Sequence, residues 1–243
     1  MSADTIRLSA DALIVFTAFL HRTEKGRNRK FLTFGFSSYL CSMELQEQLR
    51  QIKRALHSMM NGPVSQAMRN KGLTYKVNFG VEKPRLEEFS HELPKTYELA
   101  AALWKENIRE CRLLAGMLMP VADFPADLAD VWVEQILFPE EADNLVFYLL
   151  SRTSYASERA FVWLADERPM FRYVGYQLLG RLFTEKKVPN RRDMLEYLDH
   201  TTTDLRADNT MVKQAAWRSL MKFMDLGIGQ ERLGNQVLDS VGM

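Results

Sequence analysis

The sequence is poor in the residues that build metal sites, disulfide frameworks and turn-rich β folds. Its 243 residues include 2 Cys, 4 His, 12 Gly and 8 Pro. The two cysteines, Cys41 and Cys111, give neither a disulfide framework nor the paired spacing of a zinc site. The low Gly and Pro content argues against an all-β chain of this length, because such chains need many turns. We therefore expect a cytoplasmic protein without a metal ion or a cofactor.

Long apolar runs and a strong net charge are also missing. No stretch reaches the roughly 18 uninterrupted apolar residues of a membrane span, so we expect no membrane contact. The formal net charge of +1 neither favours nor excludes a nucleic-acid partner. No Ser-His-Asp order, Gly-rich phosphate loop or CxxC motif occurs. Any anion-binding surface must therefore come from local clusters of basic residues.

The N-terminal segment 1–42 differs from the rest of the chain. It contains six Lys and Arg against three Asp and Glu, a short apolar run at 12–20 and an aromatic segment at 31–40 that favours extended structure. From Met43 the pattern becomes helical at once. We interpret residues 1–42 as a divergent N-terminal extension, with Met43 as the natural start, and residues 43–243 as one domain. The alternative is a short helix and a hairpin packed on the first helix pair, and N-terminal sequencing of protein from its own cell would distinguish the two.

Beyond residue 43 the apolar residues recur almost everywhere at helical spacing, and no convincing strand pattern competes with it. The pattern predicts an all-α chain of helices joined by short connections, which is typical of bundles and solenoids. The expected helices cover residues 83–93, 95–104, 107–119, 124–137, 141–152, 156–166, 168–183, 190–200, 208–224 and 229–239.

A repeat is visible within this helical region. "FRYVGYQLL" (171–179) and "VKQAAWRSL" (212–220) share a hydrophobic–basic–x–x–small pattern followed by an aromatic residue. Residues 108–118 form a looser copy. The first two copies are separated by a period near 40, which is typical of two-helix HEAT-type repeats. Such repeats stack because one helix pair cannot bury both its faces. We therefore predict an α-α superhelix of stacked HEAT-like helix pairs. A plain α-helical bundle is the alternative.

Several segments carry a resemblance to a known family. "YELAAALWKENIRECRLLAGMLM" (97–119), "MRNKGLTYKVNFGVEKPRLEEF" (68–89) and the two repeat copies resemble the DNA alkylation repair (AlkD-like) family, over residues 43 to 222. The resemblance implies a superhelix of HEAT-like repeats whose positively lined concave face binds duplex DNA. Active members of the family are DNA glycosylases that remove N3- and N7-alkylated purines and need no metal or organic cofactor.

The resemblance also implies a catalytic carboxylate. The family's catalytic aspartate falls on Asp143, which would stabilise an oxocarbenium-like transition state and orient a water molecule. From the residues alone, Asp143 could equally be an aspartate of a helix N-terminus, favoured there by the helix dipole. Glu140 and Glu141 are expected to add negative charge beside it, which would repel phosphate.

Aromatic and basic residues complete the implied site. One cleft tryptophan of the family falls on Trp217, although its spacing also suits a core residue. The second cleft tryptophan is replaced by Pro139, and the phosphate-binding arginine is replaced by Tyr173. Basic residues at equivalent positions of two repeats could contact phosphate or bond within the repeat stack. The candidate DNA-contacting residues are Trp217, Phe138, Arg172, Tyr173 and Lys213.

Three functions are compatible with these features. The chain could be a glycosylase for alkylated purines, a non-catalytic HEAT-like module that binds nucleic acid, or a repeat scaffold that binds a protein. We favour a monomeric, DNA alkylation repair-like protein that binds duplex DNA, and whether it is an enzyme stays open at this point.

Overall fold

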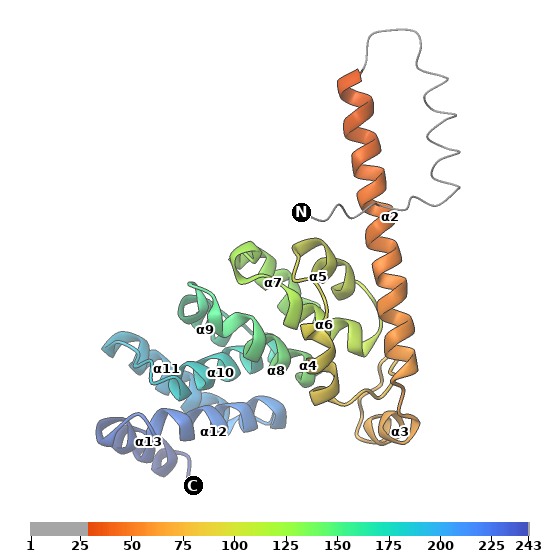
Figure 1. The fold of residues 1–243 in the computed structure, drawn as a ribbon. Helices are drawn as coiled ribbons and strands as arrows, with labels where there is room; N and C mark the ends of the chain where they lie inside the picture. The colour runs from red at the N-terminus through yellow and green to blue at the C-terminus, as the bar shows by residue number, and fades with distance from the viewer. Residues whose placement is uncertain (1–28, 243) are drawn as a thin grey trace. The chain divides into compact units, whose positions relative to one another are not determined.

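The described part of the protein is entirely helical. The computed structural model describes residues 29–242, which form twelve α-helices and two short 3-10 helices (Figure 1). No strand occurs among these residues, although Val77 and Ile108 form an isolated parallel bridge. The predicted all-α class is therefore confirmed. In the same part of the chain, no helix combines the length and the apolar character that crossing a membrane requires.

The chain divides into two compact units, residues 1–48 and 49–243. The described residues of the first unit all belong to α2 (Arg29–Ser58), which continues into the second unit without a break at Met43. The aromatic segment 31–40 is thus helical, and the hairpin expected there as an alternative is wrong. Each residue added to an existing helix gains one backbone hydrogen bond. This gain outweighs the weak preference of aromatic residues for strands. The apolar run at 12–20 lies outside the described residues.

The second unit contains eleven further α-helices within its described residues. Ten of them match the expected helices to within a few residues at most ends, whereas the short, polar helix α3 was not predicted. Two 3-10 helices, η1 (Val121–Asp123) and η2 (Leu150–Arg152), lie in connections. The α-helices are α3 (Gly62–Asn70), α4 (Lys83–His91), α5 (Tyr97–Trp104), α6 (Arg109–Leu118), α7 (Ala126–Glu134), α8 (Pro139–Tyr148), α9 (Ala156–Leu164), α10 (Pro169–Thr184), α11 (Arg191–Arg206), α12 (Thr210–Met224) and α13 (Ile228–Ser240).

Local sequence explains where these helices begin. Proline occupies the first turn of α4, α8 and α10, where its missing N–H has no intrahelical partner to lose. The side chains of Thr96, Asn190 and Asn209 each accept a hydrogen bond from a backbone N–H of the helix that follows. Such N-caps satisfy donors that the helix itself leaves unpaired.

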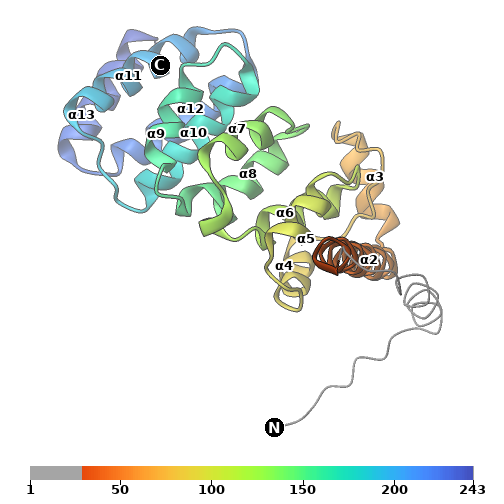
Figure 2. The ribbon, with the colours of Figure 1, turned by 90° about the horizontal axis from the view of Figure 1, so that it is seen from above.

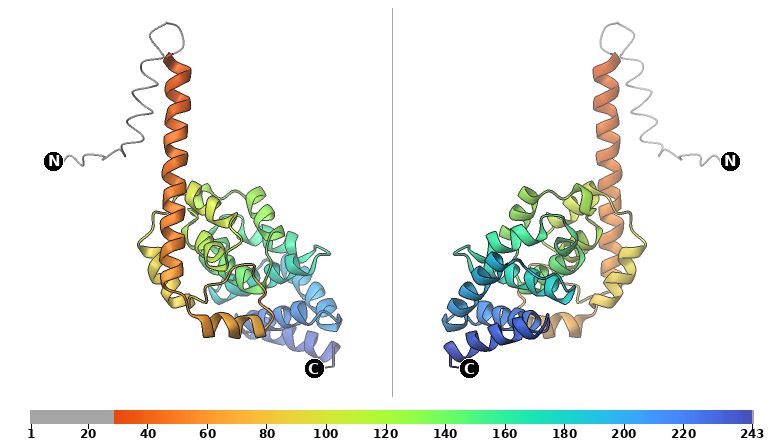
Figure 3. Two further views of the ribbon diagram at one scale, coloured as in Figure 1. Left: turned by 90° about the vertical axis from the view of Figure 1, so that its right-hand side faces the viewer. Right: turned by 90° about the vertical axis from the view of Figure 1, so that its left-hand side faces the viewer.

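The helices of the second unit form two layers. The even-numbered helices α6, α8, α10 and α12 pack side by side, and we call this layer the even row. The odd-numbered helices α5, α9, α11 and α13 pack against it from one side (Figures 1 and 2), and Figure 3 shows the same stack from its two ends. Each helix pair contacts the next pair along the chain, so the unit is an α-α superhelix of HEAT-like repeats, as predicted.

The repeat spacing is not uniform. Helices α6, α8 and α10 begin at Arg109, Pro139 and Pro169, so their starts are equally spaced. Helix α12 begins only at Thr210, after a clearly longer interval. The predicted period near 40 is therefore correct only for this last interval. The two segments that revealed the repeat lie in α10 and α12, and the longer helices α10 and α11, of 16 residues each, lengthen the interval between them.

Aromatic stacking joins successive repeats. Trp104 is buried and stacks on Trp132 with 4.3 Å between ring centroids and 3° between planes. Its indole N–H donates to the side chain of Gln135 at 2.8 Å. A buried indole needs such a partner for its N–H. The contact fixes α5 against α7, one repeat further along.

Candidate functional site

Asp143 lies in the second turn of α8, on the even row, and its carboxylate is held by two side chains of α10. Both donate to the same oxygen, Oδ1: the Tyr173 hydroxyl at 2.9 Å and the Gln177 amide at 2.6 Å. Gln177 also donates to the Tyr173 hydroxyl oxygen at 2.9 Å. Among the described residues, no hydrogen bond reaches Oδ2. The acidic residues of the first turn are Glu140 and Glu141, so Asp143 does not serve as the aspartate of the helix N-terminus.

The neighbours of Asp143 keep the donor Tyr173 protonated. Tyr173 is buried, and burial followed by the charge of Asp143 raises the pKa of Tyr173 well above its ordinary value. Arg218, on α12, acts in the opposite direction on the same pKa, which puts its positive charge close to the pair. The structure thus brings two predicted residues, Asp143 and Tyr173, into contact. Sequence reasoning missed Gln177, whose only local signal is its position four residues after Tyr173 on the same helix face.

The two glutamates that precede Asp143 are paired with buried arginines. Glu140 forms an ion pair with Arg109, and Glu141 with Arg112 at 2.8 Å. Both arginines lie on α6 and are buried, as is Glu141. Arg109 also pairs with Glu110 at 3.1 Å, so two arginines serve three glutamates, and these ion pairs reduce the negative charge beside Asp143 without cancelling it. Helical geometry separates the two sets of contacts, because residues 140 and 141 face α6 whereas residue 143 faces α10.

A second buried carboxylate, that of Glu110 on α6, accepts hydrogen bonds from the loop between α3 and α4. The Glu110 side chain accepts hydrogen bonds from the backbone N–H groups of Phe79, Gly80 and Val81 at 3.0–3.2 Å. These three backbone donors are used by Glu110 and are not open to an anion.

Phe138 and Pro139 form the start of α8. Phe138 is the N-cap residue and is partly exposed, and its ring lies 4.4 Å from that of Tyr75 between centroids. Burial, then the nearby charges of Glu141 and Glu140, raise the pKa of Tyr75 above its ordinary value. Phe138 therefore contacts the loop after α3, and Tyr75 is a neighbour that the sequence did not reveal.

Trp217 and Lys213 share a pocket on α12. Trp217 is 39% exposed, so it is not a core residue. The pocket has a volume of about 180 Å³ and its remaining walls come from Leu205, Gln214 and Arg218. Arg218, which lines the pocket, also lowers the pKa of Tyr173 through its positive charge. The predicted residues Trp217 and Lys213 are thus placed together, on the even-row helix that follows α10.

Arg172 forms an ion pair with a neighbouring helix of the repeat stack. Its guanidinium pairs with Asp204, a buried carboxylate of α11. The Tyr176 hydroxyl donates to the other oxygen of Asp204 at 2.8 Å. A buried charge is costly unless it is paired and hydrogen-bonded, and Asp204 is satisfied by both residues. This geometry favours the intra-stack role over a phosphate contact for Arg172.

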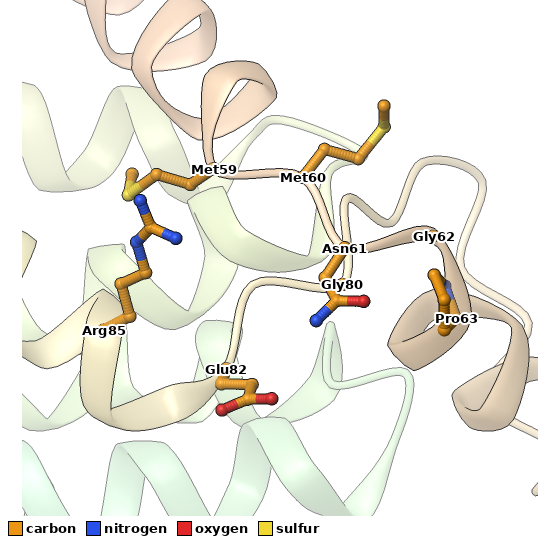
Figure 4. Close-up of a pocket in the computed structure, with 8 residues that line it drawn as sticks. All are labelled: Met59, Met60, Asn61, Gly62, Pro63, Gly80, Glu82 and Arg85. Carbon is orange, nitrogen blue, oxygen red and sulfur yellow. The ribbon is translucent and has the colours of Figure 1, made fainter.

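A further pocket lies away from Asp143, where α2, α3 and α4 meet (Figure 4). Its volume is about 340 Å³. In the close-up, Glu82 follows Gly80 on the loop and Arg85 projects from α4 beside Met59. The Asn61 side chain is used as the N-cap of α3. The charges of the lining residues oppose each other and define no ligand class. The lining residues are Met59, Met60, Asn61, Gly62, Pro63, Gly80, Glu82 and Arg85.

Comparison with known proteins identifies the family to which the chain belongs. The family model described as "DNA alkylation repair enzyme" matches residues 48–222, so the chain belongs to the DNA alkylation repair enzyme family. A solved structure described as "a new family of proteins related to the HEAT-like repeat DNA glycosylases with affinity for branched DNA structures" is similar, with a TM-score of 0.72 and 14% sequence identity. The match covers 79% of this chain and 82% of that one, and at this identity it shows the fold. No curated protein sequence is significantly similar.

Proposed function

We propose that the protein binds duplex DNA along the exposed side of the even row and excises N3- or N7-alkylated purines there. The observation that carries this proposal is the state of Asp143. One carboxylate oxygen is fixed by Tyr173 and Gln177, and the other receives no hydrogen bond from the described residues. A carboxylate fixed in this way is prepared to face positive charge that develops on a substrate.

The chemistry matches what one fixed carboxylate can do. An alkylated purine carries a positive charge and leaves without being protonated first, so no general acid is required. The C1′ carbon of the sugar becomes oxocarbenium-like as the N-glycosidic bond lengthens. The free oxygen of Asp143 would stabilise that charge and orient the attacking water. Tyr173 and Gln177 would hold the carboxylate in place without reacting.

DNA as the partner is supported by aromatic and basic residues of α12, the even-row helix that follows α10. Trp217 offers a half-exposed aromatic surface, and Lys213 and Arg218 line the same pocket. Because Glu140 and Glu141 pair with buried arginines, less of their negative charge opposes phosphate. Phosphate contacts by basic side chains supply much of the affinity of DNA-binding proteins.

A second candidate function is DNA binding without catalysis. Two positions of the resemblance favour it, since Pro139 stands where a cleft tryptophan is expected and Tyr173 stands where a phosphate-binding arginine is expected. The similar solved protein is described by its affinity for branched DNA structures. A protein scaffold is the remaining alternative.

Single-turnover release of 7-methylguanine from a methylated duplex tests the proposal. We expect release by the wild-type protein and a decrease of roughly 10²- to 10³-fold in Asp143→Asn, as for other lost electrostatic stabilisers. Asp199→Asn is the matched control, because Asp199 is an exposed aspartate of α11, and it should leave the rate unchanged. Thermal melting would show that both variants are folded.

Each other outcome points to a different function. Equal release by wild type and Asp143→Asn would refute the role of the carboxylate. No release, together with duplex binding that weakens steeply with salt, would establish the non-catalytic DNA-binding function. Neither release nor binding would leave the protein scaffold.

A further inference from the structure

An exposed phenylalanine lies on the same side of α8 as Asp143. Phe147 is 41% exposed and follows Asp143 by four residues, which places it one helical turn further along the same face. A large apolar side chain in this position gains little from burial in the free protein. Its place beside the proposed DNA-binding residues therefore needs a physical explanation.

Two cations from different helices approach the Phe147 ring. The guanidinium carbon of Arg181, on α10, lies 4.7 Å from the ring centroid, and Nζ of Lys83, the first residue of α4, lies 5.8 Å from it. The same Nζ lies 5.5 Å from the ring of Tyr148. We call these four residues the Phe147 cluster. Arg181 follows Gln177 by four residues, so α8 and α10 both extend from the Asp143 contacts into this cluster.

The cations of the cluster are largely available to a ligand. Among the described residues, no ion pair involves Lys83. Within residues 29–242, Arg181 pairs only with Glu185, at 3.1 Å, and both side chains are about one-third exposed, at 35% and 32%. Such an exposed pair is weak and easily exchanged. Lys222, on α12, adds a further positive charge nearby, because its side chain lies against Gly180, the neighbour of Arg181.

We infer that the Phe147 cluster binds an unpaired nucleobase of a DNA strand, with the base stacked on Phe147 and the adjacent phosphates bound by Arg181 and Lys83. An exposed aromatic ring between basic side chains is the combination that binds single-stranded nucleic acid, because every base has a stacking face and every nucleotide carries a phosphate. A paired base is enclosed by its neighbours in the duplex and cannot stack on the ring. The inference rests on the proposed DNA binding by the even row and adds a preference for DNA with unpaired bases.

Binding exchanges one set of contacts for another. In the free protein the cations rest over the ring, where an exposed cation–π contact is weak. When a strand binds, the cations can turn to its phosphates and release counterions, while the base takes their place on the ring. Stacking on an aromatic side chain changes affinity by roughly 5- to 150-fold per base, so the exchange favours the complex.

The test compares two duplexes of equal length, one fully paired and one with a short run of unpaired thymidines. We expect wild type to prefer the second duplex, and Phe147→Leu to weaken that binding by roughly 5- to 150-fold while leaving the fully paired duplex unaffected. Tyr97→Leu is the control, because Tyr97 is equally exposed, at 40%, on α5. Phe147→Trp, which retains an aromatic face, should keep the preference.

A salt titration separates the ring from the charges. Arg181→Gln should lower the slope of log affinity against log salt by about 0.7 for the unpaired strand, whereas Phe147→Leu should leave the slope unchanged. Equal weakening of both duplexes by Phe147→Leu, no weakening at all, or no wild-type preference would each overturn the inference. The outcome is separate from the glycosylase test, because a preference for unpaired bases is measurable whether or not methylated purines are released.

Discussion

The ion pair between Arg112 and Glu141 supports the helix that carries Asp143, and its removal has a calculable effect. Arg112 donates two hydrogen bonds to Glu141, at 2.9 and 2.8 Å, and one each to the carbonyls of Trp104 and Gln135. Both charged groups are buried. In Arg112→Met the Glu141 carboxylate stays buried without its partner, which should lower the free energy of unfolding by about 3–5 kcal/mol.

The double variant Arg112→Met/Glu141→Met gives the informative comparison. It removes the unpaired charge but leaves the carbonyls of Trp104 and Gln135 and the N–H of Leu137 without their partners. At about 1 kcal/mol for each lost hydrogen bond, the double variant should be roughly 2–3 kcal/mol less stable than wild type. It should therefore be more stable than Arg112→Met alone, although it carries one substitution more.

Urea unfolding followed by circular dichroism measures these differences, provided that the denaturant slope is unchanged among the variants. Lys187→Met is the control, because Lys187 forms an exposed pair with Glu185, and its loss should cost no more than about 1 kcal/mol. The reasoning would be refuted if Arg112→Met lowered the free energy of unfolding by less than about 1 kcal/mol. It would also be refuted if the double variant were less stable than Arg112→Met alone.

Two further predictions concern α10. Gln177→Leu removes the shorter hydrogen bond to Asp143 and should slow single-turnover release by roughly 10- to 100-fold without weakening duplex binding; an equal loss of affinity would contradict a positioning role. Tyr176 is buried and donates to Asp204, and burial and this carboxylate raise the pKa of Tyr176. At a pH above about 10, the ordinary pKa of tyrosine, only the unfolded state loses the hydroxyl proton. The free energy of unfolding should therefore fall by about 1.4 kcal/mol per pH unit for each such tyrosine. Between pH 10 and 11 we expect a shallower fall in Tyr176→Phe, and equal slopes would refute the assignment.

Much of the helical architecture could be predicted because its determinants are local. Apolar spacing, first-turn prolines and the capping side chains of Thr96, Asn190 and Asn209 mark the helices α4 to α13. Helix α3 was missed although Asn61 caps it and a proline lies in its first turn, because its apolar residues Val64, Ala67 and Met68 cover little more than one turn. The helical start at Arg29 was missed because the aromatic segment that follows it has strand propensity, which helix continuity overrides.

The candidate site could be predicted only in part. The resemblance identified Asp143 and Tyr173, but their hydrogen bond joins residues 30 positions apart, and contacts of this kind depend on how the helices pack. For the same reason Gln177, Arg218 and Tyr75 were missed. The ion pairs of Glu140 and Glu141 were missed as well, because a sequence shows a charge but not its partner on another helix.

The division of Asp143 and its donors between two helix pairs has a mechanical consequence. The carboxylate belongs to α8, and both donors belong to α10, one repeat later. A solenoid bends by small rotations between successive repeats, whereas each helix stays rigid. Bending at this junction would therefore change the distances from Asp143 to Tyr173 and Gln177 before any distance within a helix changed. The orientation of the Asp143 carboxylate therefore depends on the curvature of the superhelix at this junction.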